Sequence, residues 1–235
     1  MDVLPQELVD RIIDHILRHE LPSHSLIAKR WRRRSQQRYF DTVAFSSEDQ
    51  MILWDANIPK DPDGILSYVH RVQVRGIRSW ENPAIFGCVL KTLSSMESLT
   101  MVRTKIPPLD EIQSPVPFGE FGEALTSLTL ISQSCTLATI TSFILSLSNL
   151  KELVIDQLGI TSEQLPSTLP DTTHRKPLRW LLLEGVPDVF ETALVQHCLT
   201  CSVLNMDVCS HSVRQLIALS SETLANLSLE GKRFA

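Results

Sequence analysis

Four residues in the carboxyl-terminal third of the chain combine the side chains that bind zinc: Cys198, Cys201, Cys209 and His211. Thiolates and imidazoles are the usual ligands of a tetrahedral zinc site, and two of the cysteines have the spacing of a ligand pair. The other half of the set, Cys-x-His, is not a usual ligand spacing, and free cysteines are common core residues. The sequence therefore predicts no metal site and no bound cofactor.

Other side chains that perform catalysis are present but are not grouped by the sequence. His15, His19 and His24 lie near the amino terminus, and no nucleophile is placed beside them. No glycine-rich phosphate loop and no serine nucleophile elbow occurs in the chain. We therefore predict that the protein is not an enzyme and has no catalytic residues.

Carboxylates occupy one recurrent position in the chain. Asp156, Glu184, Asp207 and Glu230 each directly follow a six-residue phrase of the form apolar-x-x-apolar-x-apolar. If the phrases form neighbouring strands about 4.8 Å apart, these four charges stack and repel one another. A basic partner relieves that repulsion, although ordinary surface charge at a tolerant position is an equally open interpretation.

The phrase itself predicts the elements that position these carboxylates. We identify seven copies between residues 69 and 229, which start at Val69, Met96, Leu125, Leu150, Leu178, Cys201 and Leu224. Their start-to-start spacings are 27, 29, 25, 28, 23 and 23 residues, a period typical of solenoids. The fourth and sixth positions share a face in a strand, whereas in a helix the sixth position lies about 140° from the first. Each phrase therefore predicts a strand.

The segments between the phrases complete the expected fold. Apolar residues recur with helical spacing in 82–95, 134–147, 187–199 and 210–221, whereas 105–123 and 159–177 are rich in Pro, Ser and Thr and are expected to be loops. Alternating strands and helices indicate an α/β solenoid, with parallel strands on a concave face and helices or loops on a convex face.

Outward positions of these strands form the candidate binding surface. Val154, Trp180, Leu182 and Val203 add an apolar stripe beside the carboxylates, which is typical of a partner site. We predict a substrate protein that presents Lys or Arg next to apolar side chains. The predicted contact residues are Asp156, Trp180, Leu182, Glu184, Val203, Asp207 and Glu230.

The first forty residues predict a separate, small helical unit. Leu8, Ile12, Ile13 and Ile16 form an apolar stripe, and a unit of this size needs a partner or a neighbouring domain for stability. Trp31 lies within a basic run. We expect domains at 1–40 and 69–235, joined by a connecting segment at 41–68.

Both regions resemble known families. The stretch from Leu4-Pro5 to Ile16 resembles the first helix of an F-box, Ser25 to Trp31 is similar to its third helix, and 69–229 resembles a divergent leucine-rich-repeat array. The resemblance implies a non-catalytic, substrate-recruiting subunit of a cullin–RING ubiquitin ligase, which binds a Skp-type adaptor and, through it, the cullin. The adaptor-binding residues it implies are Leu4, Pro5, Leu8, Ile12, Ile13, Ile16, Leu26 and Trp31.

Two other functions remain open from the sequence. Pro22 falls where the family keeps apolar helix residues, and proline breaks a helix interior, so the chain is alternatively a leucine-rich scaffold that joins no ligase. The run from Lys29 to Arg34 is alternatively a nuclear nucleic-acid-binding patch. We favour a solvated helix face for this run, because only Trp31 interrupts the charges and no base-stacking platform is visible.

Composition sets the remaining limits. The 235 residues are 43% hydrophobic and carry a formal charge of −5. Residues 1–40 hold eight Lys or Arg against five Asp or Glu, so the remainder carries −8, which suggests two modules with different partners. Five cysteines, an odd and sparse number, favour a reducing compartment, so we expect a cytoplasmic or nuclear protein. No signal peptide is visible, and the most apolar stretch, 137–147, is too short to span a membrane.

Overall fold

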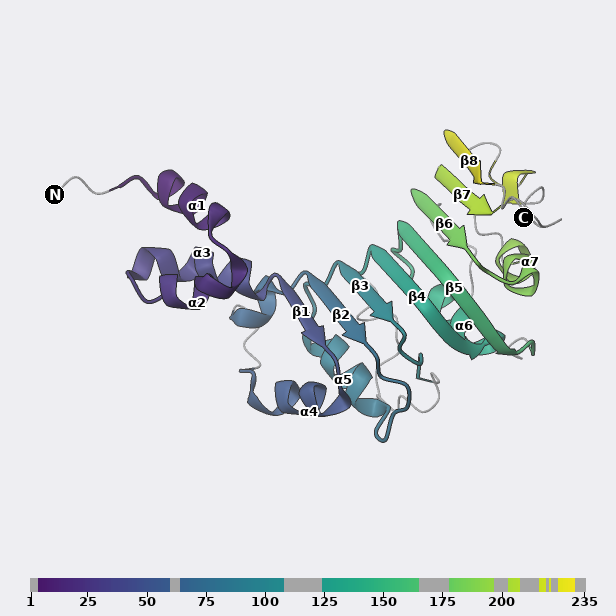
Figure 1. Cartoon of the computed structure of the whole chain (residues 1–235), viewed down its shortest axis with the longest axis horizontal. Helices are drawn as coiled ribbons and strands as arrows, with labels where there is room; N and C mark the ends of the chain where they lie inside the picture. Colours follow the sequence, from purple (N-terminus) through teal and green to yellow (C-terminus); the bar gives the residue numbers. More distant parts are fainter. Residues whose placement is uncertain are drawn as a thin grey trace, which may run out of the picture.

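The computed structural model of the chain describes residues 4–59, 64–107, 124–164, 178–196, 203–207, 216–218, 220 and 224–230. A helical unit lies at one end of an elongated molecule, and a sheet extends from it to the other end (Figure 1). The helical unit consists of α1 (Gln6–His15), η1 (Arg18–Glu20), α2 (Leu21–His24) and α3 (Lys29–Phe40).

The helical unit has a small core of its own. Val9, Ile13 and Leu21 are fully buried or nearly so, and Ile16 and Trp31 pack against them. Val9 and Ile13 are four residues apart, so α1 presents both on one side. Three buried apolar side chains are few for an independent fold, because small units bury too little surface to offset the entropy of ordering the chain.

Pro22 does not break a helix in this unit. It lies in the first turn of α2, where a helix does not need the N–H that proline lacks. Pro22, which departs from the F-box pattern, therefore does not disrupt α2.

Eight parallel strands in chain order form one sheet (Figure 1). Their bounds are β1 (Thr42–Phe45), β2 (Arg71–Arg75), β3 (Ser98–Val102), β4 (Ser127–Thr136), β5 (Glu152–Ser162), β6 (Trp180–Glu184), β7 (Val203–Asp207) and β8 (Asn226–Glu230). Each of the seven sequence phrases overlaps one of the strands β2 to β8, so the prediction of a strand at each phrase is confirmed.

The register of the sheet follows the phrase as well. The fourth phrase positions pair in one row across the sheet: Val72, Leu99, Leu128, Leu153, Leu181 and Leu204. All six are at most 1% exposed, because they point to the side of the sheet that the helices cover. Burial of this apolar row is the main stabilising term of the region.

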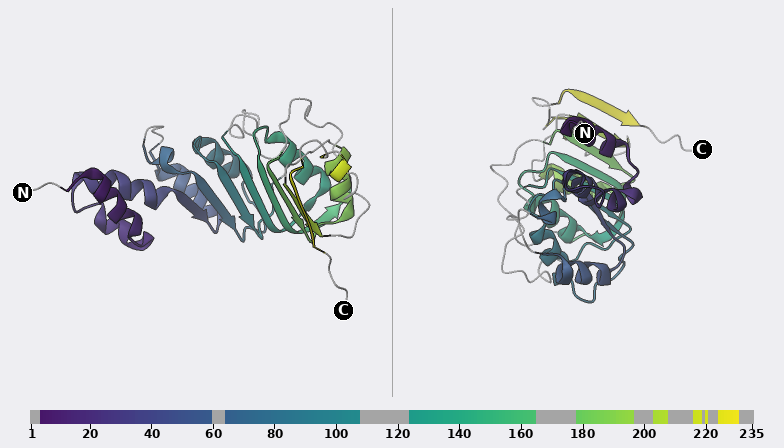
Figure 2. Two further views of the ribbon diagram at one scale, coloured as in Figure 1. Left: turned by 90° about the horizontal axis from the view of Figure 1, so that it is seen from above. Right: turned by 90° about the vertical axis from the view of Figure 1, so that its left-hand side faces the viewer.

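Helices cover one face of the sheet and leave the other open (Figure 2). They are α4 (Glu48–Asn57), η2 (Ile65–Tyr68), α5 (Ala84–Thr92), α6 (Leu137–Ser146) and α7 (Asp188–Gln196). The Ser47 side chain accepts a hydrogen bond from the backbone N–H of Gln50 and so caps the start of α4, and Thr136 caps α6 in the same way. Phe86, Phe143 and Phe190 from these helices are fully buried in the core.

The structure corrects the expected leucine-rich-repeat solenoid. It is an α/β arrangement with a single parallel sheet, and the described segments between neighbouring strands do not repeat. A helix and a 3₁₀ turn separate β1 from β2, a single helix separates β2 from β3, and β4 and β5 have 10 and 11 residues where β2 has five. The six-residue phrase specifies a buried strand but does not specify the segment that returns to the next one. The sheet has an open face and a helix-covered face in place of the expected concave and convex faces.

Three expected boundaries are also wrong. The sheet begins with β1 inside the segment 41–68, which was expected to be a connector, and α4 lies in that segment too. β4 and β5 continue through 134–136 and 159–162, where a helix and a loop were expected. Phe40, Val43 and Phe45 form an eighth copy of the phrase, which is the signal that identifies β1.

Candidate protein-binding surfaces

Exposed apolar side chains concentrate in the helical unit. Of the ten large apolar residues that are strongly exposed in the described part of the chain, six lie between Leu4 and Ile27. Leu4, Leu8 and Ile12 are 40%, 47% and 43% exposed, and their spacing of four residues places Leu8 and Ile12 on one side of α1. A contiguous exposed apolar stripe of this kind marks a partner site in a stable protein. We call these three residues the α1 stripe.

A second apolar group lies in the turn between α2 and α3. Leu26 and Ile27 are 78% and 61% exposed. The Arg30 guanidinium donates a 3.0 Å hydrogen bond to the backbone oxygen of Leu4 and joins the start of α3 to the start of the α1 stripe. Pro5, which precedes α1, is exposed as well.

The eight residues implied as adaptor contacts therefore divide into two groups. Five are exposed: Leu4, Pro5, Leu8, Ile12 and Leu26. Ile13 has no exposed surface and packs the core of the unit, so it is not a surface contact in this structure. Ile16 and Trp31 are half-buried against the same core, where Trp31 stacks on His24 with ring centroids 6.1 Å apart. The sequence did not separate these roles, because both groups are apolar and interleaved on α1.

Some side chains of the basic run form contacts within the helical unit. Arg30 bonds to Leu4 as described, and Arg34 forms a 2.7 Å ion pair with Asp14 of α1. Arg38, further along α3, donates to the backbone oxygens of Ile13 and Ile16. The favoured interpretation of the run as a solvated helix face is consistent with the fold, because Lys29, Arg32 and Arg33 face solvent.

The open face carries the predicted substrate contacts that the structure describes. Trp180 is 40% exposed, Glu184 is exposed, and Asp156 and Leu182 are half-buried. Asp156 pairs with Glu184 in the register of β5 and β6, so their carboxylates start from adjacent backbone positions. The side chains of Val203, Asp207 and Glu230 lie outside the described part, although the backbones of Asp207 and Glu230 pair in register.

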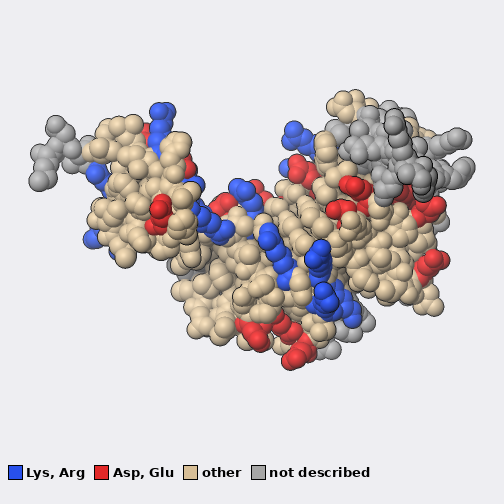
Figure 3. All heavy atoms as spheres, in the orientation of Figure 1, with Lys and Arg blue, Asp and Glu red and all other residues tan. Residues whose placement is uncertain are grey.

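Charge is unevenly distributed along the open face. Arg71 and Arg75 lie on β2, whereas Glu152, Asp156 and Glu184 lie on β5 and β6. Figure 3 shows Lys and Arg gathered over the β2 side and Asp and Glu over the β5–β6 side. None of these three carboxylates forms an ion pair with another described residue. Carboxylates without an ion-pair partner beside an exposed tryptophan suit a basic segment with apolar neighbours.

Glu152 belongs to this acidic surface but was not among the predicted contacts. Its backbone pairs with that of Trp180, and its side chain is exposed. Glu152 occupies the third position of its phrase, as Trp180 does, and this shared position is the sequence signal that identifies Glu152 as part of the surface. We define the acidic surface as Glu152, Asp156, Trp180, Leu182 and Glu184.

Five residues with a left-handed backbone lie at the same level of adjacent strands. The residues after the paired positions on β2 to β6 all have positive φ: Gly76 (75°), Arg103 (50°), Ser132 (52°), Gln157 (58°) and Gly185 (59°). After them, Thr104 and Gln133 turn inward and donate to backbone oxygens of neighbouring strands, at 3.2 Å to Val74 and 2.9 Å to Met101. The backbone therefore changes direction at the same level in five strands, and β4 and β5 continue to pair beyond it, from Gln133 with Leu158 onward.

The structure places no metal centre among these surfaces. Within the described residues, no group of three or more His, Cys, Asp or Glu side chains is arranged to hold a metal ion. The zinc candidates Cys198, Cys201, Cys209 and His211 lie outside the described residues. None of the described helices combines the length and apolar character needed to cross a membrane.

Comparison with known proteins adds no assignment: no family model matches the chain, and no curated protein matches it.

Proposed function

We propose that the chain is a substrate-recruiting, F-box-type subunit of a cullin–RING ubiquitin ligase. In this proposal the helical unit binds a Skp-type adaptor, and the open face of the sheet holds a substrate protein. The chain performs no bond chemistry. It raises the effective concentration of a substrate lysine near a ubiquitin-carrying enzyme, as a bivalent linker does.

The α1 stripe is the observation that carries the proposal. Leu4, Leu8 and Ile12 are all at least 40% exposed, next to a core of only three buried side chains. Apolar helix faces left in water commonly bind a groove or another helix, and anchors spaced by four residues are the pattern of such contacts. Burial of each large apolar side chain contributes roughly 1.5–3 kcal/mol, so a partner that covers the stripe stabilises the unit appreciably.

The acidic surface supports the second half of the proposal. Trp180 and Leu182 offer apolar contact, and Glu152, Asp156 and Glu184 offer unpaired carboxylates beside them. Tryptophan at an interface is a frequent binding hot spot, and adjacent carboxylates orient a basic partner. We therefore propose that the substrate presents Lys or Arg next to apolar residues.

Adaptor binding is tested with the full chain and a purified Skp-type adaptor. The double variant Leu8→Asp/Ile12→Asp should lose adaptor binding in a pull-down or by calorimetry, because two carboxylates then occupy the apolar contact. Both side chains are already solvent-exposed, so the unit should keep its helical circular dichroism.

Leu53→Asp is the matched control for this test. Leu53 is 60% exposed on α4, outside the helical unit, so the same change should leave adaptor binding intact. Failure of the unmodified chain to bind the adaptor, or full binding by the double variant, would contradict the proposal.

Substrate binding is tested separately with the variant Asp156→Lys/Glu184→Lys. Proteins that co-purify with the wild-type chain on the adaptor should be lost, while the adaptor itself stays bound. Asp49→Lys on α4, an exposed acidic position away from the open face, is the control. An unchanged set of co-purified proteins would remove the acidic surface from the proposal.

A further inference from the structure

A hollow of about 640 Å³ lies at the carboxyl ends of strands β2 to β5, away from the two surfaces described above. Arg78 follows β2, Arg103 and Lys105 follow β3, and Cys135 and Thr161 come from the ends of β4 and β5. The volume is within the range of small-molecule sites, about 300–1,000 Å³.

Among the described residues, every charged side chain that lines the hollow is positive. Arg78, Arg103 and Lys105 line it, and no Asp or Glu does so among the described residues. All three side chains are exposed, and none forms an ion pair or a side-chain hydrogen bond in the described part of the chain. Residues 41–235 carry a net charge of −8, so three cations without an ion-pair partner around one hollow contrast with the rest of this region.

The remaining lining is neutral. Burial raises the pKa of the Cys135 thiol from 9.0 to about 12, so this side chain stays protonated and adds no negative charge at neutral pH. Thr104 donates to backbone oxygens, and the hydroxyls of Thr136 and Thr139 bond to each other at 2.8 Å. Ser134 and Thr161 remain exposed in the hollow as hydroxyl donors.

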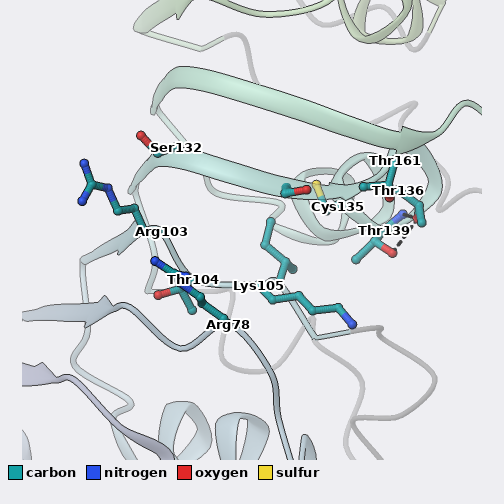
Figure 4. Close-up of a pocket in the computed structure, with 11 residues that line it drawn as sticks. Arg78, Arg103, Thr104, Lys105, Ser132, Cys135, Thr136, Thr139 and Thr161 are labelled. Carbon is teal, nitrogen blue, oxygen red and sulfur yellow. Dashed lines mark hydrogen bonds between the residues drawn. The ribbon is translucent and has the colours of Figure 1, made fainter.

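The three cations are spread along the hollow. Figure 4 shows Arg103 at one end near Ser132, whereas the Lys105 amino group extends toward the side where Thr136 and Thr139 lie. A single small ion does not contact all three side chains in this arrangement. A ligand with anionic groups at two or more points does, and guanidinium groups match the geometry of phosphate oxygens.

We propose that this hollow binds a small molecule that carries at least two phosphate groups. The phosphates lie against Arg78, Arg103 and Lys105, and the exposed hydroxyls of Ser134 and Thr161 donate further hydrogen bonds. The site is independent of the adaptor surface and of the acidic surface, so its test does not depend on the proposed ligase function.

The test measures binding of inorganic tripolyphosphate to the full chain by isothermal titration calorimetry at low ionic strength. We expect saturable binding that weakens as salt is added, because the contacts are charged and partly solvent-exposed. Arg78→Gln and Lys105→Gln should each raise the Kd about tenfold, since each removes one charge-assisted contact. Both positions are exposed, and unchanged thermal unfolding confirms that the variants fold.

Lys91→Gln is the charge-matched control, because Lys91 is exposed on α5 and does not line the hollow. Its Kd should equal that of the wild type. No saturable binding at millimolar tripolyphosphate, or equal weakening by Lys91→Gln, would overturn the proposal. Tighter binding of a capped hexaglutamate peptide, again weakened by Arg78→Gln, would also overturn it and assign the hollow to an acidic protein segment.

Discussion

The helical unit and the sheet use their apolar residues in opposite ways. The sheet buries a continuous cluster from Val43 to Leu216, and its open face is largely polar or charged. Among its described apolar residues, the helical unit fully buries Val9, Ile13 and Leu21 and exposes the α1 stripe together with Leu26. The sheet is therefore stabilised by its own core, whereas the helical unit leaves large apolar side chains exposed to solvent. This difference suggests that folding of one region and binding by the other are separable.

The largest effect is expected from a change in the centre of the sheet. Leu153 is fully buried and pairs with Leu128 and Leu181 on the neighbouring strands. Leu153→Ala should lower the free energy of unfolding by about 2–5 kcal/mol, because it removes buried methyl groups and leaves a cavity. Denaturant unfolding followed by circular dichroism measures this. Val154→Ala is the control. Val154 is the next residue, is half-buried and faces the open side, so this change should lower the free energy of unfolding much less.

The corresponding change in the helical unit should have a local effect. Ile13→Ala removes one of three core side chains and should unfold α1 to α3 in the absence of a partner. The unfolding midpoint of the sheet should stay near that of the wild type, because the two cores are separate clusters. Equal lowering of the sheet midpoint by Ile13→Ala and Leu153→Ala would show that the regions fold as one unit.

Alkaline pH should destabilise the sheet through Cys135. The folded pKa, about 12, lies above the value of 9.0 for an unburied thiol. Above about pH 9 the unfolded chain loses this proton while the folded chain keeps it, so the free energy of unfolding falls as pH rises toward 12. Cys135→Ala should make the free energy of unfolding depend less steeply on pH in this range.

The two described cysteines should also differ in reactivity. A thiol-alkylating reagent should modify exposed Cys88 well before buried Cys135, and peptide mass spectrometry measures the modification at each position.

A smaller effect is expected where the backbone is left-handed. Gly76 has φ of 75°, and the space within 4 Å of where a Cβ atom would lie is open, so Gly76→Ala should cost about 1 kcal/mol through backbone strain alone. At Arg103, with φ of 50°, Arg103→Gly should be more stable than Arg103→Ala by a similar amount. Equal thermal stability of the two Arg103 variants would show that the positive φ carries no strain.

The sequence predicted the positions of the strands better than the lengths of the strands and the segments that flank them. The apolar phrase determines which residues face the core, so β2 to β8 and the buried row through Leu153 follow from it. Neither the long extensions of β4 and β5 nor the sheet's beginning at β1 was predicted, because the phrase describes only six residues and Phe40 was counted with the helical unit. The roles of Ile12 and Ile13 could not be separated either. Both are apolar neighbours on α1, and only packing against α2 and α3 decides which one is buried.

The cationic hollow illustrates a second limit of the sequence. Arg78, Arg103 and Lys105 are separated along the chain from Ser134 and Thr161, and no spacing rule connects them. They meet only because β2 to β5 are parallel and turn at the same level after Gly76 and its counterparts. Sites of this kind arise from register, which an isolated motif does not encode.

Hydrogen exchange of the full chain, with and without a Skp-type adaptor, tests the central comparison most directly. We expect rapid exchange of the α1 and α3 amides in the free chain, slow exchange of the β5 amides, and adaptor-induced protection confined to the helical unit. Equally slow exchange of α1 and β5 without the adaptor would show that the two regions do not differ in stability, and no change in α1 on adding the adaptor would show that the helical unit does not bind it.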